Sequence, residues 1–129
     1  IIEKDVPMHC STFEPVGRRF RRHLEKVPFA TPRLPYLPNR LARFVDEPDF
    51  VELLSTHVHS PVLWRESIDQ VLDRWPDAFL LEVGPRAVLT NLLDKKWHPG
   101  VRKAAMDSKD DTAAHLAELF ARLRSPEEG

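Results

Sequence analysis

Apolar residues recur at intervals of three and four along much of this chain, a spacing that is typical of amphipathic helices. The pattern predicts helices over residues 15–27, 48–58, 62–75, 86–97 and 110–124. A continuous apolar run over residues 78–83 ends at Gly84-Pro85 and predicts a strand that is covered on both faces. Extended segments are also expected over residues 34–37, because Pro35 and Pro38 disfavour a helix there, and near residues 101–106. The chain is therefore expected to be rich in helices, with few strands.

Helices that alternate with a few buried strands indicate an α/β fold with a parallel sheet. The expected strands are too few for a complete sheet, so we expect one side of a larger layered domain. The chain begins with Ile1 and shows neither an initial methionine nor the basic and apolar segments of a signal peptide. This start favours a piece of a longer protein.

Charge and cysteine content narrow the possible classes of protein. The 129 residues carry 19 Lys+Arg against 20 Asp+Glu, and the net charge of −1 argues against a nucleic-acid partner. The sequence holds no apolar run of about 18 residues, so no membrane span is predicted. A single cysteine excludes a disulfide framework and a zinc site made of cysteines alone.

Histidines supply the first candidates for chemistry. His9 follows a short extended segment, at a strand-to-loop junction of the kind where catalytic bases lie. Cys10 is next to it, but neighbouring residues on a strand point to opposite faces, which favours an inert thiol over a Cys/His nucleophile pair. His57 and His59 share a face only in an extended segment, whereas a helix end is expected there. The sequence predicts no metal site.

Charged residues leave two further alternatives open. A basic cluster on the first expected helix is either a docking face for an acidic partner or a solvated helix face; it comprises Arg18, Arg19, Arg21, Arg22 and Lys26. Glu82, at the end of the expected strand, is either an acid or base or a residue that orients the following turn. The sequence shows no glycine-rich phosphate loop and no Gly-x-Ser-x-Gly elbow. The residues by themselves therefore offer a candidate base and no nucleophile.

Three segments in a fixed order carry a resemblance to a known family. They are residues 6–10 (VPMHC), 60–64 (SPVLW) and 81–85 (LEVGP). Together they closely resemble the C-terminal part of malonyl-CoA:acyl-carrier-protein transacylases and of the acyltransferase domains of polyketide synthases. The resemblance covers residues 1–97, and the last expected helix is compatible with it.

The resemblance implies a place in the fold as well as a reaction. It implies the C-terminal part of a hydrolase-like, three-layer acyltransferase core, with few parallel strands flanked by helices. Residues 1–8 would end a small ferredoxin-like subdomain, residues 9–124 would belong to the core, and residues 125–129 would form a frayed tail. In this family a serine attacks malonyl-CoA, and an arginine binds the free carboxylate of the malonyl group. Both would precede Ile1, so the isolated chain is expected to be inactive.

The same resemblance assigns roles to individual residues. His9 matches the catalytic base, and His57, four residues before Pro61, matches the position whose backbone carbonyl orients that base. Met8 precedes the base, and its bulk favours malonyl over methylmalonyl as the acyl group. Arg86 departs from the family, which has a small residue after Gly-Pro.

The implied enzyme binds no cofactor: malonyl-CoA is its substrate, and an acyl carrier protein brings the phosphopantetheine thiol. The other partner is the missing N-terminal part of the same cytoplasmic enzyme. Because carrier proteins are acidic, the docking interpretation of the basic cluster gains weight, with Arg18, Arg19 and Arg22 as its contact residues. The alternatives are an acyl-carrier-protein hydrolase on the same scaffold and a non-catalytic fragment that binds the carrier protein.

Overall fold

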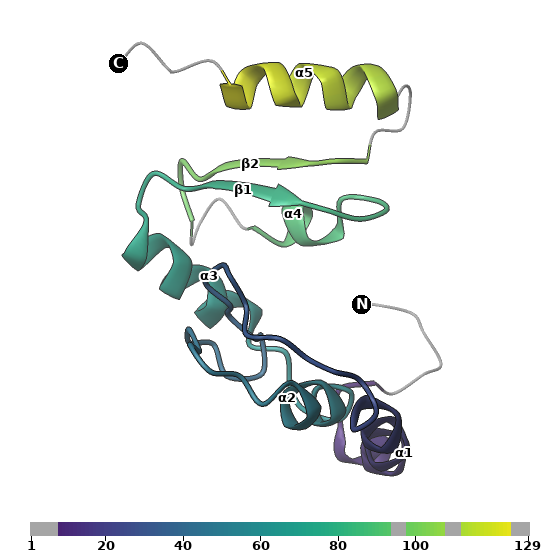
Figure 1. The fold of residues 1–129 in the computed structure, drawn as a ribbon. Coiled ribbons are helices and arrows are strands. Elements are labelled where there is room, and N and C mark those ends of the chain that lie inside the picture. Colours follow the sequence, from purple (N-terminus) through teal and green to yellow (C-terminus); the bar gives the residue numbers. More distant parts are fainter. Residues whose placement is uncertain (1–7, 94–97, 108–111, 125–129) are drawn as a thin grey trace. The chain divides into compact units, whose positions relative to one another are not determined.

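The computed structural model describes residues 8–93, 98–107 and 112–124 of the chain (Figure 1). It divides into two compact units, Ile1–Arg74 and Trp75–Gly129. The predicted α/β class is confirmed, because the chain is rich in helices and contains a small parallel sheet. None of the helices within these described ranges combines the length and apolar character that crossing a bilayer requires.

The first unit contains three α-helices at the predicted places. A short 3-10 turn, η1 (Ser11–Phe13), leads into α1 (Glu14–Leu24), and α2 (Phe50–His57) and α3 (Trp64–Arg74) follow. Pro15 lies in the first turn of α1, where its missing N–H costs nothing. The carboxylate of Asp49 accepts a hydrogen bond of 2.9 Å from the backbone N–H of Glu52 and so caps the start of α2.

Helix α1 ends three residues before its predicted end at residue 27. The N–H of Lys26 donates to the carbonyl of His23, and the N–H of Val27 donates to that of Leu24. These are the tighter turns with which helices often finish, and Pro28 cannot continue the hydrogen-bond ladder. The predicted helix was therefore too long for a local reason.

An aromatic cluster and a few buried aliphatic residues form the interior of this unit. Phe50 packs against Phe29 and Tyr36, with ring centroids 5.2 and 5.3 Å apart, and burial raises the pKa of the Tyr36 hydroxyl. Leu53 of α2 and Ile68 of α3 are also buried. In the segment over residues 34–37, which was predicted to be extended, Leu34 lies in a bend and Tyr36 forms an antiparallel bridge with Val45.

The second unit is built around a two-stranded parallel sheet. Strands β1 (Phe79–Glu82) and β2 (Arg102–Ala105) pair with Phe79 opposite Arg102, and α4 (Val88–Leu92) and α5 (Thr112–Arg124) lie on opposite sides of the sheet (Figure 1). The residues of β1 are half-buried at every position, so both faces of this strand are partly covered.

The start of α4 differs from the predicted helix over residues 86–97. Arg86 adopts a left-handed backbone conformation with φ of 68°, and Ala87 is also non-helical, so the helix begins only at Val88. The backbone N–H of Arg86 donates to the carboxylate of Asp107 and so holds this conformation. Residues 94–97 of the predicted helix lie outside the described residues.

Helix α4 has only five residues and is held at both ends by charged side chains from the strands. The Glu82 carboxylate accepts hydrogen bonds from the N–H groups of Leu89 (3.0 Å) and Thr90 (2.8 Å). The Lys103 ammonium donates to the carbonyls of Thr90 (2.8 Å) and Leu93 (2.9 Å). A negative charge at the N-terminus and a positive charge at the C-terminus complement the helix dipole. Glu82 thus orients the turn, which was one of its two predicted roles.

Acid should weaken the contact between Glu82 and the N-terminus of α4, because it protonates the Glu82 carboxylate. Burial raises the pKa of the Glu82 carboxyl, but the backbone hydrogen bonds from Thr90 and Leu89 outweigh burial and hold the pKa below its usual range. A depressed folded-state pKa contributes stability above the unfolded-state value of about 4.3, and this contribution is lost as the pH falls through the folded-state pKa. Glu82→Gln should therefore lower the free energy of unfolding at pH 7. Between pH 7 and pH 3.5, the free energy of unfolding of this variant should also fall less than that of the wild type. Urea unfolding at the two pH values measures both effects.

The matched control is Glu118→Gln, which neutralises an exposed carboxylate on α5. It should leave the difference in unfolding free energy between the two pH values unchanged. If both variants respond to acid as the wild type does, Glu82 does not stabilise α4 through its charge.

Candidate active site

His9 lies in the turn before α1, where its ring and its backbone both contact the end of α2. The N–H of His9 donates to the carbonyl of Val58 at 2.9 Å. Its Nδ1 lies 3.0 Å from the carbonyl oxygen of His57. Because a carbonyl only accepts hydrogen bonds, Nδ1 carries the proton, and Nε2 of the neutral ring is left as a proton acceptor. This geometry gives His9 the form that a general base requires.

The position of His57 in its helix explains why its carbonyl is available. His57 is the last residue of α2, and Val58 is the C-cap. The final carbonyls of an α-helix have no partner within the helix. His9 supplies donors to two of them, and it does so in a left-handed backbone conformation with φ of 62°. Such a conformation is uncommon for a residue other than glycine and is found at functional turns.

The side chain of His57 also contacts His9. The two imidazole centroids are 4.9 Å apart, and the ring planes are nearly perpendicular, at 87°. Burial lowers the pKa of His57, and the charge of His9 lowers it further. One residue therefore meets His9 through both its backbone and its ring.

Helix α1 fixes α2 behind this site through a close crossing at Gly17. A Cβ atom built on Gly17 would lie 2.6 Å from the carbonyl oxygen of Ser55 and 2.7 Å from Cδ2 of His59. Ser55 itself is 1% exposed. Arg21 joins the same helices through an ion pair of 2.6 Å between its Nη1 and Oε2 of Glu52. The helix that presents the carbonyl of His57 is thus held by both packing and charge.

Gly17 and Ser55 were not predicted from the sequence to belong to this site. Glycine inside a helix costs roughly 0.5–1 kcal/mol relative to alanine. Its presence in the middle of an otherwise regular amphipathic helix was therefore a usable signal of a close helix crossing. The burial of Ser55 had no comparable signal, because a single serine gives no periodic pattern.

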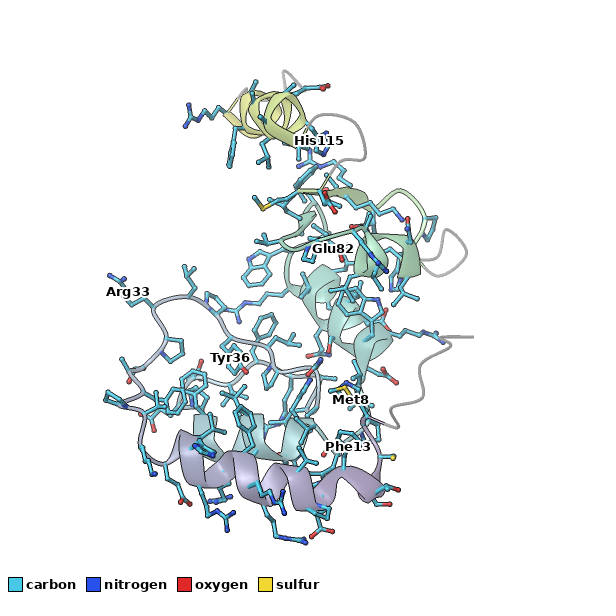
Figure 2. The ribbon with its side chains drawn as sticks, turned by 90° about the vertical axis from the view of Figure 1, so that its right-hand side faces the viewer. Met8, Phe13, Arg33, Tyr36, Glu82 and His115 are labelled. Atoms are coloured by element: carbon cyan, nitrogen blue, oxygen red, sulfur yellow. The ribbon has the colours of Figure 1, made fainter. Side chains whose placement is uncertain are left out.

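The other predicted site residues lie around α1 and its leading turn. Met8 is adjacent to His9 and 50% exposed, and Figure 2 shows it near Phe13 at the turn that enters α1. Cys10 is half-buried and extended. The histidine rings predicted to diverge do so: the ring of His57 packs on His9, and that of His59 lies against Gly17. The described residues contain no group of three or more His, Cys, Asp or Glu side chains that could hold a metal ion.

The basic cluster divides into two roles in the structure. Arg21 is engaged by Glu52 and by Glu25, and these hydrogen bonds raise its pKa. Arg19 and Arg22 are exposed on α1. Arg18 is also exposed, and it pairs with Glu14 one helical turn earlier at 2.5 Å. Arg18, Arg19 and Arg22 share one side of the helix, because residues three and four apart are neighbours there.

Solved structures of known proteins superimpose on this chain and indicate the class of its fold. No family model matches the chain. The structure of a malonyl transacylase of Streptococcus pneumoniae superimposes with a TM-score of 0.76 and 28% identity, covering 90% of this chain and 36% of that one. A type II polyketide synthase malonyl-transacylase, solved in complex with its acyl carrier protein, gives a TM-score of 0.74 and 24% identity over 91% of this chain and 38% of that one. The fold is that of a portion of a malonyl acyltransferase.

A curated relative points to the same family. The malonyl CoA-acyl carrier protein transacylase of Buchnera aphidicola is 26% identical over 92 residues, which are 70% of this chain and 29% of the relative. The predicted resemblance is therefore confirmed: the chain is similar to malonyl-CoA:acyl-carrier-protein transacylases over most of its length. It spans about a third of the proteins that it matches.

The close crossing at Gly17 generates a prediction about stability. Gly17→Ala should force the α1–α2 pair apart, because the nearest obstacle is the backbone carbonyl of Ser55, which cannot rotate away. We expect a loss of about 1–3 kcal/mol in the free energy of unfolding, as for other overpacked sites. Urea unfolding of the wild type and the variant measures it.

Gly84→Ala is the control, since a Cβ atom there would meet no heavy atom within 4 Å. Its effect should stay within about 0.5 kcal/mol. Equal effects of the two substitutions would show that the Gly17 crossing is not tight.

Proposed function

We propose that this chain is the histidine-bearing part of an acyltransferase that moves a malonyl group from CoA to the phosphopantetheine thiol of an acyl carrier protein. The observation that carries the proposal is the hydrogen bond from Nδ1 of His9 to the carbonyl of His57, which leaves Nε2 free to accept a proton. It joins two residues to which the family resemblance gave complementary roles. The similarity to malonyl transacylases supplies the substrate class.

His9 acts in both halves of the proposed reaction. Its Nε2 accepts the proton of a serine hydroxyl as the serine Oγ bonds to the malonyl carbonyl carbon. The carbon–sulfur bond of malonyl-CoA then breaks, and the CoA thiolate leaves with the proton that His9 held. In the second half His9 takes the proton of the carrier thiol as its sulfur bonds to the malonyl carbonyl carbon. The bond between this carbon and the serine Oγ then breaks, and the serine oxygen takes the proton back from His9. The carbonyl of His57, which lies 3.0 Å from Nδ1, would stabilise the transient imidazolium.

The serine and the arginine that binds the malonyl carboxylate belong, in this proposal, to a segment that precedes Ile1. Large apolar side chains exposed on each unit support such a further segment, because patches of this kind mark covered surfaces in complete proteins. They include Val16 and Phe20 on α1, and Val83 and Leu92 in the second unit. Residues 1–8 would end a small subdomain, residues 9–124 would complete the acyltransferase core, and residues 125–129 would form a tail. The chain alone would transfer no acyl group.

The proposal also includes the acyl group that is transferred and the cellular compartment in which the enzyme acts. Met8 lies beside His9, and its bulk would crowd the α-methyl branch of methylmalonyl, which favours malonyl. The enzyme needs no bound cofactor, because malonyl-CoA is a substrate and the carrier protein brings the phosphopantetheine. It would act in the cytoplasm.

The acidic carrier protein would dock on the basic side of α1. Arg18, Arg19 and Arg22 are exposed there, whereas Arg21 is held in the crossing to α2. The solved complex of a structurally similar malonyl-transacylase with its acyl carrier protein supports a carrier protein as the partner. Complementary charge raises the association rate more than it raises affinity.

The first test replaces the proposed base. In the full-length natural protein, His9→Ala should lower the rate of malonyl transfer from malonyl-CoA to a carrier protein by about 10²–10⁴-fold, the range that general bases contribute. The assay follows acylated carrier protein, free CoA and free malonate together. His23→Ala, which removes an exposed imidazole from α1, should have no such effect.

Other outcomes would decide between the alternatives. Near-normal transfer by His9→Ala would refute the role of His9. Release of free malonate by the wild type without acylation of the carrier protein would favour the hydrolase. Binding of the carrier protein without turnover would favour a non-catalytic fragment.

The docking face is tested by charge reversal. The double variant Arg19→Glu/Arg22→Glu should raise KM for the carrier protein about tenfold, with a larger effect at low salt because salt screens exposed charges. KM for malonyl-CoA should not change. Arg43→Glu, an exposed arginine of the same unit away from α1, is the control. A similar rise in KM for the double variant and for Arg43→Glu would indicate an effect of net charge and not of docking.

A further inference from the structure

The carbonyl of His57 fixes only part of the orientation of the His9 ring. A hydrogen bond to Nδ1 sets the direction of one N–H group, at 3.0 Å from its acceptor. The ring can still tilt about this hydrogen bond through coupled changes of the two side-chain torsions of His9. The distal nitrogen would then swing through an arc, although a general base needs that nitrogen within about 2.6–3.2 Å of the proton that it accepts.

The ring of His57 restricts this remaining rotation. It meets the ring of His9 with a centroid separation of 4.9 Å and an angle of 87° between the planes, the edge-to-face arrangement that aromatic pairs prefer. Turning His9 about its hydrogen bond would break this contact. The carbonyl and the ring of one residue therefore restrain two different motions of His9.

The charge states of the pair are compatible with this contact throughout a proton transfer. Burial of His57 and the neighbouring charge of His9 both lower the pKa of His57. This direction disfavours a state in which both rings are charged, and such a state would push the rings apart. Gly17 lets α1 approach the end of α2, and the ring of His59 fills the space beside it and not the space beside His9.

We infer that the imidazole of His57 is a positioning residue for His9, in addition to the backbone carbonyl that the same residue supplies. This inference rests on the proposed function for its catalytic consequence, but the restraint on the ring exists whatever the reaction is. The side chain of His57 does not touch the acyl group in this scheme. It holds the base in the orientation that the hydrogen bond begins to define.

Substitutions at residue 57 separate the ring from the carbonyl, because every variant keeps the carbonyl. His57→Gln and His57→Leu remove the ring, and His57→Phe keeps a ring without titratable nitrogens. The first measurement is the ¹⁵N spectrum of the His9 imidazole in the full-length natural protein. The wild type and His57→Phe should show one tautomer with the proton on Nδ1. In the variants without a ring, the His9 imidazole should leave the carbonyl of residue 57 for part of the time, so its signals should average between the two tautomers.

The second measurement is malonyl transfer by the same proteins. We expect kcat to fall about tenfold in His57→Gln and His57→Leu, since small misplacements of a catalytic group cost up to about 10²-fold. KM for malonyl-CoA should stay within about twofold, and His57→Phe should lose less activity than either variant without a ring. Thermal unfolding identifies any variant that fails to fold, and the other ring-deficient variant then decides.

The outcomes distinguish this inference from the proposed function. If a folded variant without a ring matches the wild type in its ¹⁵N spectrum, the positioning role is refuted even if His9→Ala abolishes transfer. If the wild type transfers no malonyl group, the proposed function fails, and the ¹⁵N spectra still decide whether the ring of His57 restrains His9.

Discussion

The carbonyls at the end of α2, which have no partner within the helix, are the feature on which the candidate site depends. A helix of this length leaves its last carbonyls without partners, and here His9 supplies a backbone N–H to one and a ring N–H to the other. The hydrogen bonds join two segments that are remote in the sequence, since His9 and His57 are 48 positions apart. They also fix the tautomer of His9. One local requirement of helix geometry thus produces both the connection and the chemical form of the base.

The rest of the first unit keeps that helix end in place. Asp49 caps the start of α2, the Arg21–Glu52 pair joins it to α1, and Gly17 allows the two backbones to approach. The second unit uses the same principle on a smaller scale, since Glu82 and Lys103 satisfy opposite ends of α4. In both units, polar interactions at the ends of helices help to define the local structure.

Much of the fold could be predicted from periodicity, and the errors have physical causes. The helices of the first unit begin within two residues of their expected positions, because an amphipathic pattern reports directly on a helix that packs along one side. The predicted start of α4 was wrong because the left-handed conformation of Arg86 depends on Asp107, which is 21 residues away. The residues of β1 are half-buried on both faces, because an apolar run records the capacity of a strand to be covered and not how completely it is covered.

The sequence by itself determined the helices, the parallel α/β class and, through three short segments, the residues that form the candidate site. It brought His9 and His57 into one scheme only through the resemblance to a family, and it assigned the carbonyl of His57 and not its ring. The tertiary structure decided how the two residues meet: the Nδ1 bond, the edge-to-face rings and the crossing at Gly17. These contacts depend on where a helix ends and how closely two helices cross. A periodic pattern encodes neither the last residue of the helix nor the distance between the two helices. Both result from the packing of segments that are remote in sequence.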